Sequence, residues 1–222
     1  MNLISESLGL TTIVGGWLLF ALVIIWTLKT APWHKIDSDK GAQHVLFAAS
    51  VIVFLVWQFG ASLDNGITFH FLLMALSTMM FGPQFAILGM LLALVGVTIQ
   101  ADLGWLGLGV NAVLMGVVPI TVTWLMYKLG AKFLAANFFV YIFYNGFFSA
   151  AVGVVISLSL AAVVLSVNDV YSYQVLEQSF IVYIPLMATP EGFVNGMILA
   201  ALVVLKPHWI ATFHDSTYIN NK

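Results

Sequence analysis

The chain of 222 residues contains no cysteine and no arginine, and only 7% of its residues are charged. The absence of cysteine excludes disulfide bonds and thiolate metal sites. A soluble domain carries roughly 25% charged residues, so this sequence has too few of them to cover a surface that faces water. The net charge of −2 and the lack of a basic stripe favour no nucleic-acid partner.

Sequence motifs of common enzymes are also missing. There is no HExxH, no GxSxG and no glycine-rich phosphate loop with a lysine, so we expect no enzyme and no ATP hydrolysis by this chain. No linker, low-complexity segment or repeat divides it, which predicts one domain over residues 1–222. The first apolar run has no basic residue ahead of it, as a signal peptide would have, and is expected to be a helix of the protein.

What the chain does contain is long apolar runs, and 62% of its residues are hydrophobic. A helix crosses a bilayer with about 20 apolar residues, and the runs lack the alternation of an outer-membrane barrel. These features predict an all-α membrane protein with a single bundle of about seven transmembrane helices. The expected spans are residues 8–28, 43–59, 67–81, 84–99, 106–127, 133–167 and 178–205.

The lysines predict the orientation. With seven spans, all the basic residues fall on one side of the membrane, namely Lys29, Lys35, Lys40, Lys128, Lys132, Lys206 and Lys222. The positive-inside rule makes that side cytoplasmic, with the N-terminus outside and the C-terminus in the cytoplasm. We therefore expect a multi-pass protein of a cell membrane, such as the bacterial inner membrane, with the lipid bilayer as its surroundings.

Two of the expected spans are unusual in length. The third is short and ends at a Phe-Gly-Pro break, Phe81 to Pro83. One of its ends should therefore lie in a cavity or against other helices. The sixth is too long for a straight crossing and is expected to tilt, to extend beyond the lipid, or to break near Gly146 or Gly153. We treat it as one span, because dividing it would put the last lysines outside.

His70 begins the third span and is the first candidate for a site. A neutral imidazole is a common metal ligand, and Met74 would offer a thioether from the same helical face. Asp64 and Asp102 lie on the same outer side in this topology. We expect these residues to meet His70 in an outward-facing pocket for a metal ion. The alternative is an interfacial histidine that hydrogen-bonds to a backbone carbonyl.

Glu191 and Asn195 form a second polar pair inside the last span, one helical turn apart. Pro185 and Pro190 precede them and should each remove a helical hydrogen bond. One interpretation is a polar element that gates or couples transport. The other is a carboxyl that satisfies backbone groups loosened by the bend.

Asn111 is the third intramembrane polar residue, and it follows Gly107 and Gly109. The two glycines allow backbones to approach closely, and an asparagine there can bond across helices. We expect its role to be structural.

Taken in order, these residues resemble the CbiM/NikM family, the substrate-binding membrane subunits of energy-coupling factor transporters for cobalt and nickel. The resemblance is carried by His70, Gly82-Pro83, Gln100, Asp102-Leu103-Gly104, Leu108-Gly109-Val110-Asn111, Glu191-Gly192 and Lys206-Pro207. It implies a seven-helix bundle with an outside N-terminus and an outward-facing site for Ni²⁺ or Co²⁺. The ion would be cargo, with no permanently bound cofactor. An ATPase pair and a transmembrane coupling subunit would be the partners.

The resemblance also implies a ligand set, from which this chain departs. In the family the ion is held by the N-terminal amine, by the amide and imidazole nitrogens of a histidine at position two, and by a further histidine. His70 matches that further histidine, and Met1 would carry the amine, but position two is Asn2. Either another group completes a different site, or the metal differs, or metal binding has been lost. The candidates for the missing group are Glu6, Asp64, Asp102 and Met74.

Two functions are consistent with these residues and with the resemblance. The first is uptake of a divalent transition-metal ion of the cobalt or nickel kind, captured at the outward-facing site. The second is a non-transport role on the same scaffold, as a membrane binding or assembly protein, which the loss of the histidine at position two favours. An ATPase that co-purifies would distinguish the first from the second.

Overall fold

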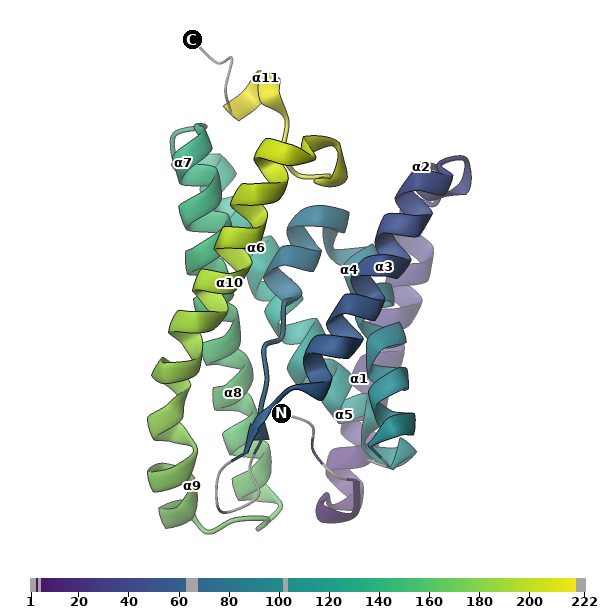
Figure 1. Cartoon of the computed structure of the whole chain (residues 1–222). Coiled ribbons are helices and arrows are strands. Elements are labelled where there is room, and N and C mark those ends of the chain that lie inside the picture. Colours follow the sequence, from purple (N-terminus) through teal and green to yellow (C-terminus); the bar gives the residue numbers. More distant parts are fainter. Residues whose placement is uncertain (1–2, 4, 63–67, 102–103, 219–222) are drawn as a thin grey trace.

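The computed structural model describes residues 3, 5–62, 68–101 and 104–218 as a bundle of long helices (Figure 1). The long helices are α1 (Leu10–Thr30), α3 (Lys40–Gln58), α4 (Met74–Gln100), α6 (Val118–Phe133), α8 (Ser149–Val167) and α10 (Ile184–Leu205). The short ones are α2 (His34–Asp37), α5 (Leu108–Ala112), α7 (Phe138–Val140), α9 (Tyr173–Ser179) and α11 (Asp215–Tyr218). Strands β1 (Ala61–Ser62) and β2 (Thr68–Phe69) pair antiparallel, with Ala61 opposite Phe69.

Within the described residues, six helical stretches are long and apolar enough to cross a membrane. They are Leu10–Thr30, Lys40–Gln58, Met74–Gln100, Trp105–Phe133, Phe138–Val167 and Tyr173–Leu205. The all-α membrane class is thus confirmed, whereas the count of seven spans is not. The expected sixth span is a single stretch, as predicted, and its irregularity is a π-helical segment, Tyr141–Phe148, around Gly146.

The third and fourth expected spans are joined in α4, and the chain reverses between them. Gly82 interrupts the helix with a φ of 77° and a ψ of 167°. Before the break, Leu72 contacts Trp57 at the end of α3, whereas after it Phe85 packs with Leu46 near the start of α3. Residues 70–81 therefore run antiparallel to α3, and residues 84–100 return parallel to it (Figure 1). We call residues 70–81 the broken leg, because only residues 74–81 of it are helical.

Helices α2, α7 and α11 lie at one end of the bundle (Figure 1), and by the bounds of the helices the described lysines belong to this end. Lys35 lies in α2, with Lys29 before it in α1 and Lys40 after it at the start of α3. Lys128 and Lys132 lie near the end of α6, and Lys206 follows α10. The hairpin β1–β2 and α9 lie at the opposite end (Figure 1). This distribution agrees with the expected alternation of loops, and the orientation of the termini in the membrane stays a prediction.

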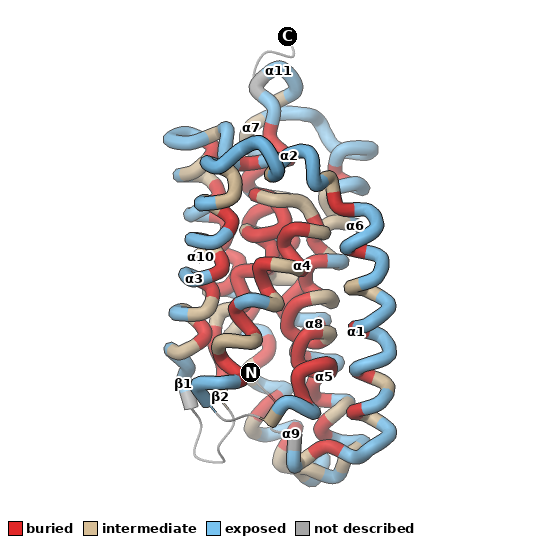
Figure 2. Tube along the Cα trace, turned by 90° about the vertical axis from the view of Figure 1, so that its right-hand side faces the viewer, coloured by how far each residue is buried: buried red, intermediate tan, exposed pale blue. Residues whose placement is uncertain are grey.

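The core follows α4, α5 and α8, while α1 and α3 turn much of their surface outward (Figure 2). Leu18 and Leu22 of α1 are more than half exposed, which is expected of side chains that face lipid rather than water. Where α1 meets α5, an added Cβ on Gly109 would lie 2.8 Å from the backbone nitrogen of Trp17. Glycine is therefore required at this crossing, as the sequence predicted for Gly109.

Candidate metal site

His70 follows β2 directly and is buried, with 6% of its surface exposed. Its ring lies against the indole of Trp57, with the centroids 5.3 Å apart, and its Nδ1 is 3.1 Å from the carbonyl oxygen of Phe71. Residues 70–73 are not helical, because α4 begins only at Met74. The prediction that His70 and Met74 share a helical face is therefore wrong.

The contact between Nδ1 and the Phe71 carbonyl is the kind of bond that the interfacial alternative predicted. It is also the kind of bond that prepares a histidine to bind a metal. When Nδ1 donates to a carbonyl, the tautomer is fixed and the lone pair lies on Nε2. The observed contact thus fits both interpretations of His70 and excludes neither.

The main chain on both sides of His70 is held by other elements. Before it, Phe69 pairs with Ala61 of β1 and packs against the ring of Phe180, with the centroids 5.3 Å apart. After it, the indole nitrogen of Trp57 donates to the carbonyl of Leu72 over 3.3 Å. An extended segment inside a membrane protein needs such partners, because each unpaired backbone group there costs several kcal/mol.

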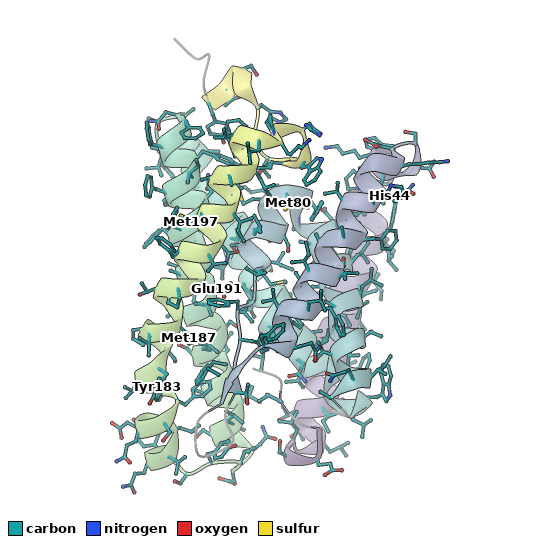
Figure 3. The ribbon with its side chains drawn as sticks, viewed as in Figure 1. His44, Met80, Tyr183, Met187, Glu191 and Met197 are labelled. Atoms are coloured by element: carbon teal, nitrogen blue, oxygen red, sulfur yellow. The ribbon has the colours of Figure 1, made fainter. Side chains whose placement is uncertain are left out.

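Glu191 and Asn195 of α10 reach this same segment. The carboxylate of Glu191 accepts hydrogen bonds from the backbone nitrogens of Leu72 and Leu73, each over 2.8 Å. Glu191 points from α10 toward the chain that leads into α4 (Figure 3). It therefore satisfies backbone groups of another element, and not those loosened in its own helix. Only Pro190 lies inside α10, since Pro185 is in its first turn, where no helical bond is lost.

Asn111 of α5 holds the start of the chain. Its side-chain oxygen accepts from the backbone nitrogen of Leu3, and its side-chain nitrogen donates to the carbonyl of Leu3, both over 2.8 Å. Leu3 packs in the same hydrophobic cluster as Trp57, Phe69 and Met74. The role of Asn111 is therefore structural, as expected, but its partner is the main chain of Leu3, which is not part of a helix. We call this contact the clamp of Asn111 on Leu3, which directly follows Met1 and Asn2.

The structure describes only some of the other predicted ligands. Met1, Asn2, Asp64 and Asp102 lie outside the described residues. Met74 is buried at the first position of α4, and Glu6 is exposed. In the described part of the chain, no three His, Cys, Asp or Glu side chains gather as a metal cluster. All the proposed ligands, His70 included, therefore stay predictions.

Sequence reasoning missed the tail after α10. The hydroxyl of Thr212 donates to the carbonyl of Met79 over 2.7 Å, and the backbone nitrogen of Ala211 donates to the carbonyl of Met80 over 2.8 Å. These carbonyls lie in the last turn of the broken leg before the break at Gly82, where the carbonyls of a helix lack donors within the helix. The broken leg is thus capped at both ends, by α10 and by the tail that follows it. No sequence pattern around Thr212 predicts its hydrogen bond to Met79.

The family model for the "cobalt uptake substrate-specific transmembrane region", CbiM, matches residues 3–209. The chain belongs to the CbiM family. Membership confirms the resemblance seen in the sequence and makes the protein a multi-pass membrane component of transition-metal uptake. The CbiM family describes a transport component and is not a known enzyme family.

Solved structures share the fold. A transition metal transporter aligns with a TM-score of 0.71 and 17% identity, over 100% of both chains. A truncated transition metal transporter aligns with a TM-score of 0.69 and 18% identity, over 92% of this chain and 99% of that one. At these identities the similarity shows the fold alone. No curated protein sequence matches the chain.

Proposed function

We propose that this protein captures a divalent transition-metal ion, Co²⁺ or Ni²⁺, for a transporter of the energy-coupling factor type. The ion would enter from outside, at the end of the bundle that holds β1, β2 and α9. Its ligands would be His70 and groups of the N-terminal segment. Met1 would carry the amine, and Glu6, Asp64, Asp102 or Met74 would complete the set where Asn2 replaces the histidine of the family.

The clamp of Asn111 on Leu3 is the observation that supports this proposal best. Two hydrogen bonds of 2.8 Å hold the main chain directly after positions one and two, inside the cluster that also contains the neighbours of His70. The family ligands come from these two parts of the chain. Leu3 is buried and bonded through both of its main-chain groups, so the chain next to positions one and two is held in the bundle.

Transport would follow from alternating exposure of this site. The protein lacks its own ATP-binding motif, so the energy would come from an ATPase pair through a transmembrane coupling subunit. The lysine-rich end, with α2, α7 and α11, would face the cytoplasm under the positive-inside rule. That end would therefore meet the partners, while His70 lies toward the other end.

Calorimetric titration of the purified protein with NiCl₂ and with CoCl₂ tests the proposal. We expect saturable binding by the wild type and none by His70→Ala. His44→Ala is the matched control, because His44 is exposed near the start of α3, far along the bundle from the site (Figure 3). Equal binding by wild type and His70→Ala, for every metal tested, would contradict the proposal.

The alternative of a non-transport binding or assembly role is favoured by one feature, Asn2 in place of the histidine. Affinity purification from native membranes distinguishes the two functions. Capture of an ATPase and a membrane coupling subunit supports transport. Capture of a metalloenzyme or a biogenesis factor without an ATPase supports the alternative.

A further inference from the structure

Glu191 is a buried acid that the proposed ligand set does not use, with 2% of its surface exposed. Both oxygens of its carboxylate are engaged by the broken leg. Oε2 accepts from the backbone nitrogen of Leu72 and Oε1 from that of Leu73, each over 2.8 Å. A single hydrogen bond typically contributes about 0.5–1.5 kcal/mol, and a buried backbone N–H that loses its partner costs about 1–3 kcal/mol. Glu191 is therefore a strong anchor for the chain that follows His70.

Asn195, one turn further along α10, completes the anchor. Its side-chain nitrogen donates to Oε1 of Glu191 over 2.9 Å and to the main-chain oxygen of Glu191 over 2.8 Å. Its side-chain oxygen accepts from the backbone nitrogen of Leu76 over 2.9 Å. The pair thus receives three backbone N–H groups at the start of α4, which have no partner within the helix. This arrangement fixes the position of the broken leg along the axis of α10.

The anchor also determines the direction of the chain. Leu73 has a φ of 59° and a ψ of 18°, the left-handed conformation, and it is not a glycine. This conformation costs a bulky residue about 1–3 kcal/mol and persists only where its surroundings impose it. The bond from Leu73 to Glu191 is such a constraint. The turn at Leu73 joins residues 70–72, which are not helical, to α4, so it sets the path of the main chain that follows His70.

We propose that Glu191 is a positioning residue for the metal site at His70. It holds Leu72 and the left-handed Leu73, and through them the imidazole, without itself contacting the ion. The inference rests on the proposed function and adds to it a residue on α10 that lies outside the ligand set. Partners that position a metal ligand typically change metal affinity by about 10- to 100-fold when they are mutated.

The test compares Glu191→Gln with the wild type by titration with NiCl₂ and CoCl₂. Glutamine keeps the shape but replaces one acceptor with an NH₂ group, so one of the two backbone N–H groups loses its partner. We expect metal affinity to fall about 10- to 100-fold. We also expect the visible absorption spectrum of saturating bound Co²⁺ to change, because a rotated imidazole alters the ligand field.

Thr212→Val is the matched control. It removes the hydrogen bond to Met79 at the opposite end of the same broken leg and lies away from His70. It should lower the thermal unfolding temperature in detergent while metal affinity and the Co²⁺ spectrum stay at the values of the wild type. A purely structural role for Glu191 predicts the same pattern for Glu191→Gln. Wild-type affinity and spectrum in a less stable Glu191→Gln protein would overturn the inference.

Asn195→Ala provides a second test if Glu191→Gln does not fold. It keeps both hydrogen bonds that Leu72 and Leu73 donate to the carboxylate, but it removes the side chain that orients the carboxylate and accepts from Leu76. We expect a smaller loss of affinity with a spectral change in the same direction, and no change in either would overturn the inference. Absence of saturable metal binding by the wild type is a different result, because it overturns the proposed function itself.

Discussion

Asn111 of α5 exchanges two hydrogen bonds of 2.8 Å with the main chain of Leu3, although 108 positions separate the two residues in the sequence. Both residues are buried, so loss of the asparagine leaves two backbone groups without partners at about 1–3 kcal/mol each. We predict that Asn111→Leu, which keeps the size of the side chain, releases the N-terminal segment. Metal affinity should fall, and deuterium uptake by the N-terminal peptide should rise in hydrogen exchange followed by mass spectrometry.

A control for this variant is Asn168→Ala. Asn168 also accepts a backbone hydrogen bond near the start of the chain, from Gly9 over 2.7 Å, but at the entrance to α1. The Asn168→Ala variant should loosen the first turn of α1 and leave metal affinity unchanged. Unchanged hydrogen exchange around Leu3 in Asn111→Leu would show that the clamp does not hold the segment.

Gly82 is required by its conformation alone. Its φ of 77° and ψ of 167° lie in a region that only glycine adopts readily, and no atom lies within 4 Å of an added Cβ. Gly82→Ala should therefore destabilise the protein by about 1–3 kcal/mol through backbone strain and not through a clash. Thermal unfolding in detergent measures the effect. Gly15→Ala in α1, also without neighbours within 4 Å, should be neutral or stabilising by up to about 1 kcal/mol.

Thr212 joins the tail to the end of the broken leg. Its hydroxyl donates to Met79 over 2.7 Å and lies 2.6 Å from the hydroxyl of Tyr141, which is fully buried. Thr212→Val leaves the Met79 carbonyl and the tyrosine without a partner. We predict a loss of about 1–3 kcal/mol in stability. Thr212→Ser, which keeps the hydroxyl, should restore most of it, and equal unfolding temperatures for the valine and serine variants would contradict the role of the hydrogen bonds.

Asn2 stands where the family has a histidine. A substitution at this position tests whether positions one and two form a metal site together with His70. If positions one and two take part with His70, Asn2→His should tighten Ni²⁺ binding in calorimetric titration by adding an imidazole. The gain should disappear in Asn2→His combined with His70→Ala. A gain that survives loss of His70 would place the added histidine in a different site.

Much of this fold follows from the sequence because a bilayer leaves few options. Long apolar runs with few charges must form helices, and the described lysines then lie at one end of the bundle. The break at Gly82 was also predictable, since Gly-Pro interrupts a helix. The start of the third helix was not, because nothing in the sequence of residues 68–73 shows that they stay outside the helix. That outcome depends on partners far away in the sequence, chiefly Trp57 and Glu191.

The site was predictable in the same uneven way. A buried histidine, a carboxylate and two asparagines in an apolar chain were conspicuous, and each proved to be buried. Their roles were not predictable from spacing, because Glu191, Asn195 and Asn111 bind backbone groups of other elements. Backbone atoms are the same in every residue, so no pattern in the sequence identifies which ones will need a partner.

X-ray absorption at the metal edge, on protein loaded with Ni²⁺ or Co²⁺, tests most directly whether His70 holds the ion. Imidazole ligands give a characteristic scattering pattern from the outer ring atoms. We predict this pattern in the wild type and its loss in His70→Ala, with His44→Ala unchanged. The same imidazole scattering in His70→Ala as in the wild type, or oxygen scattering alone in both, would contradict a metal site at His70.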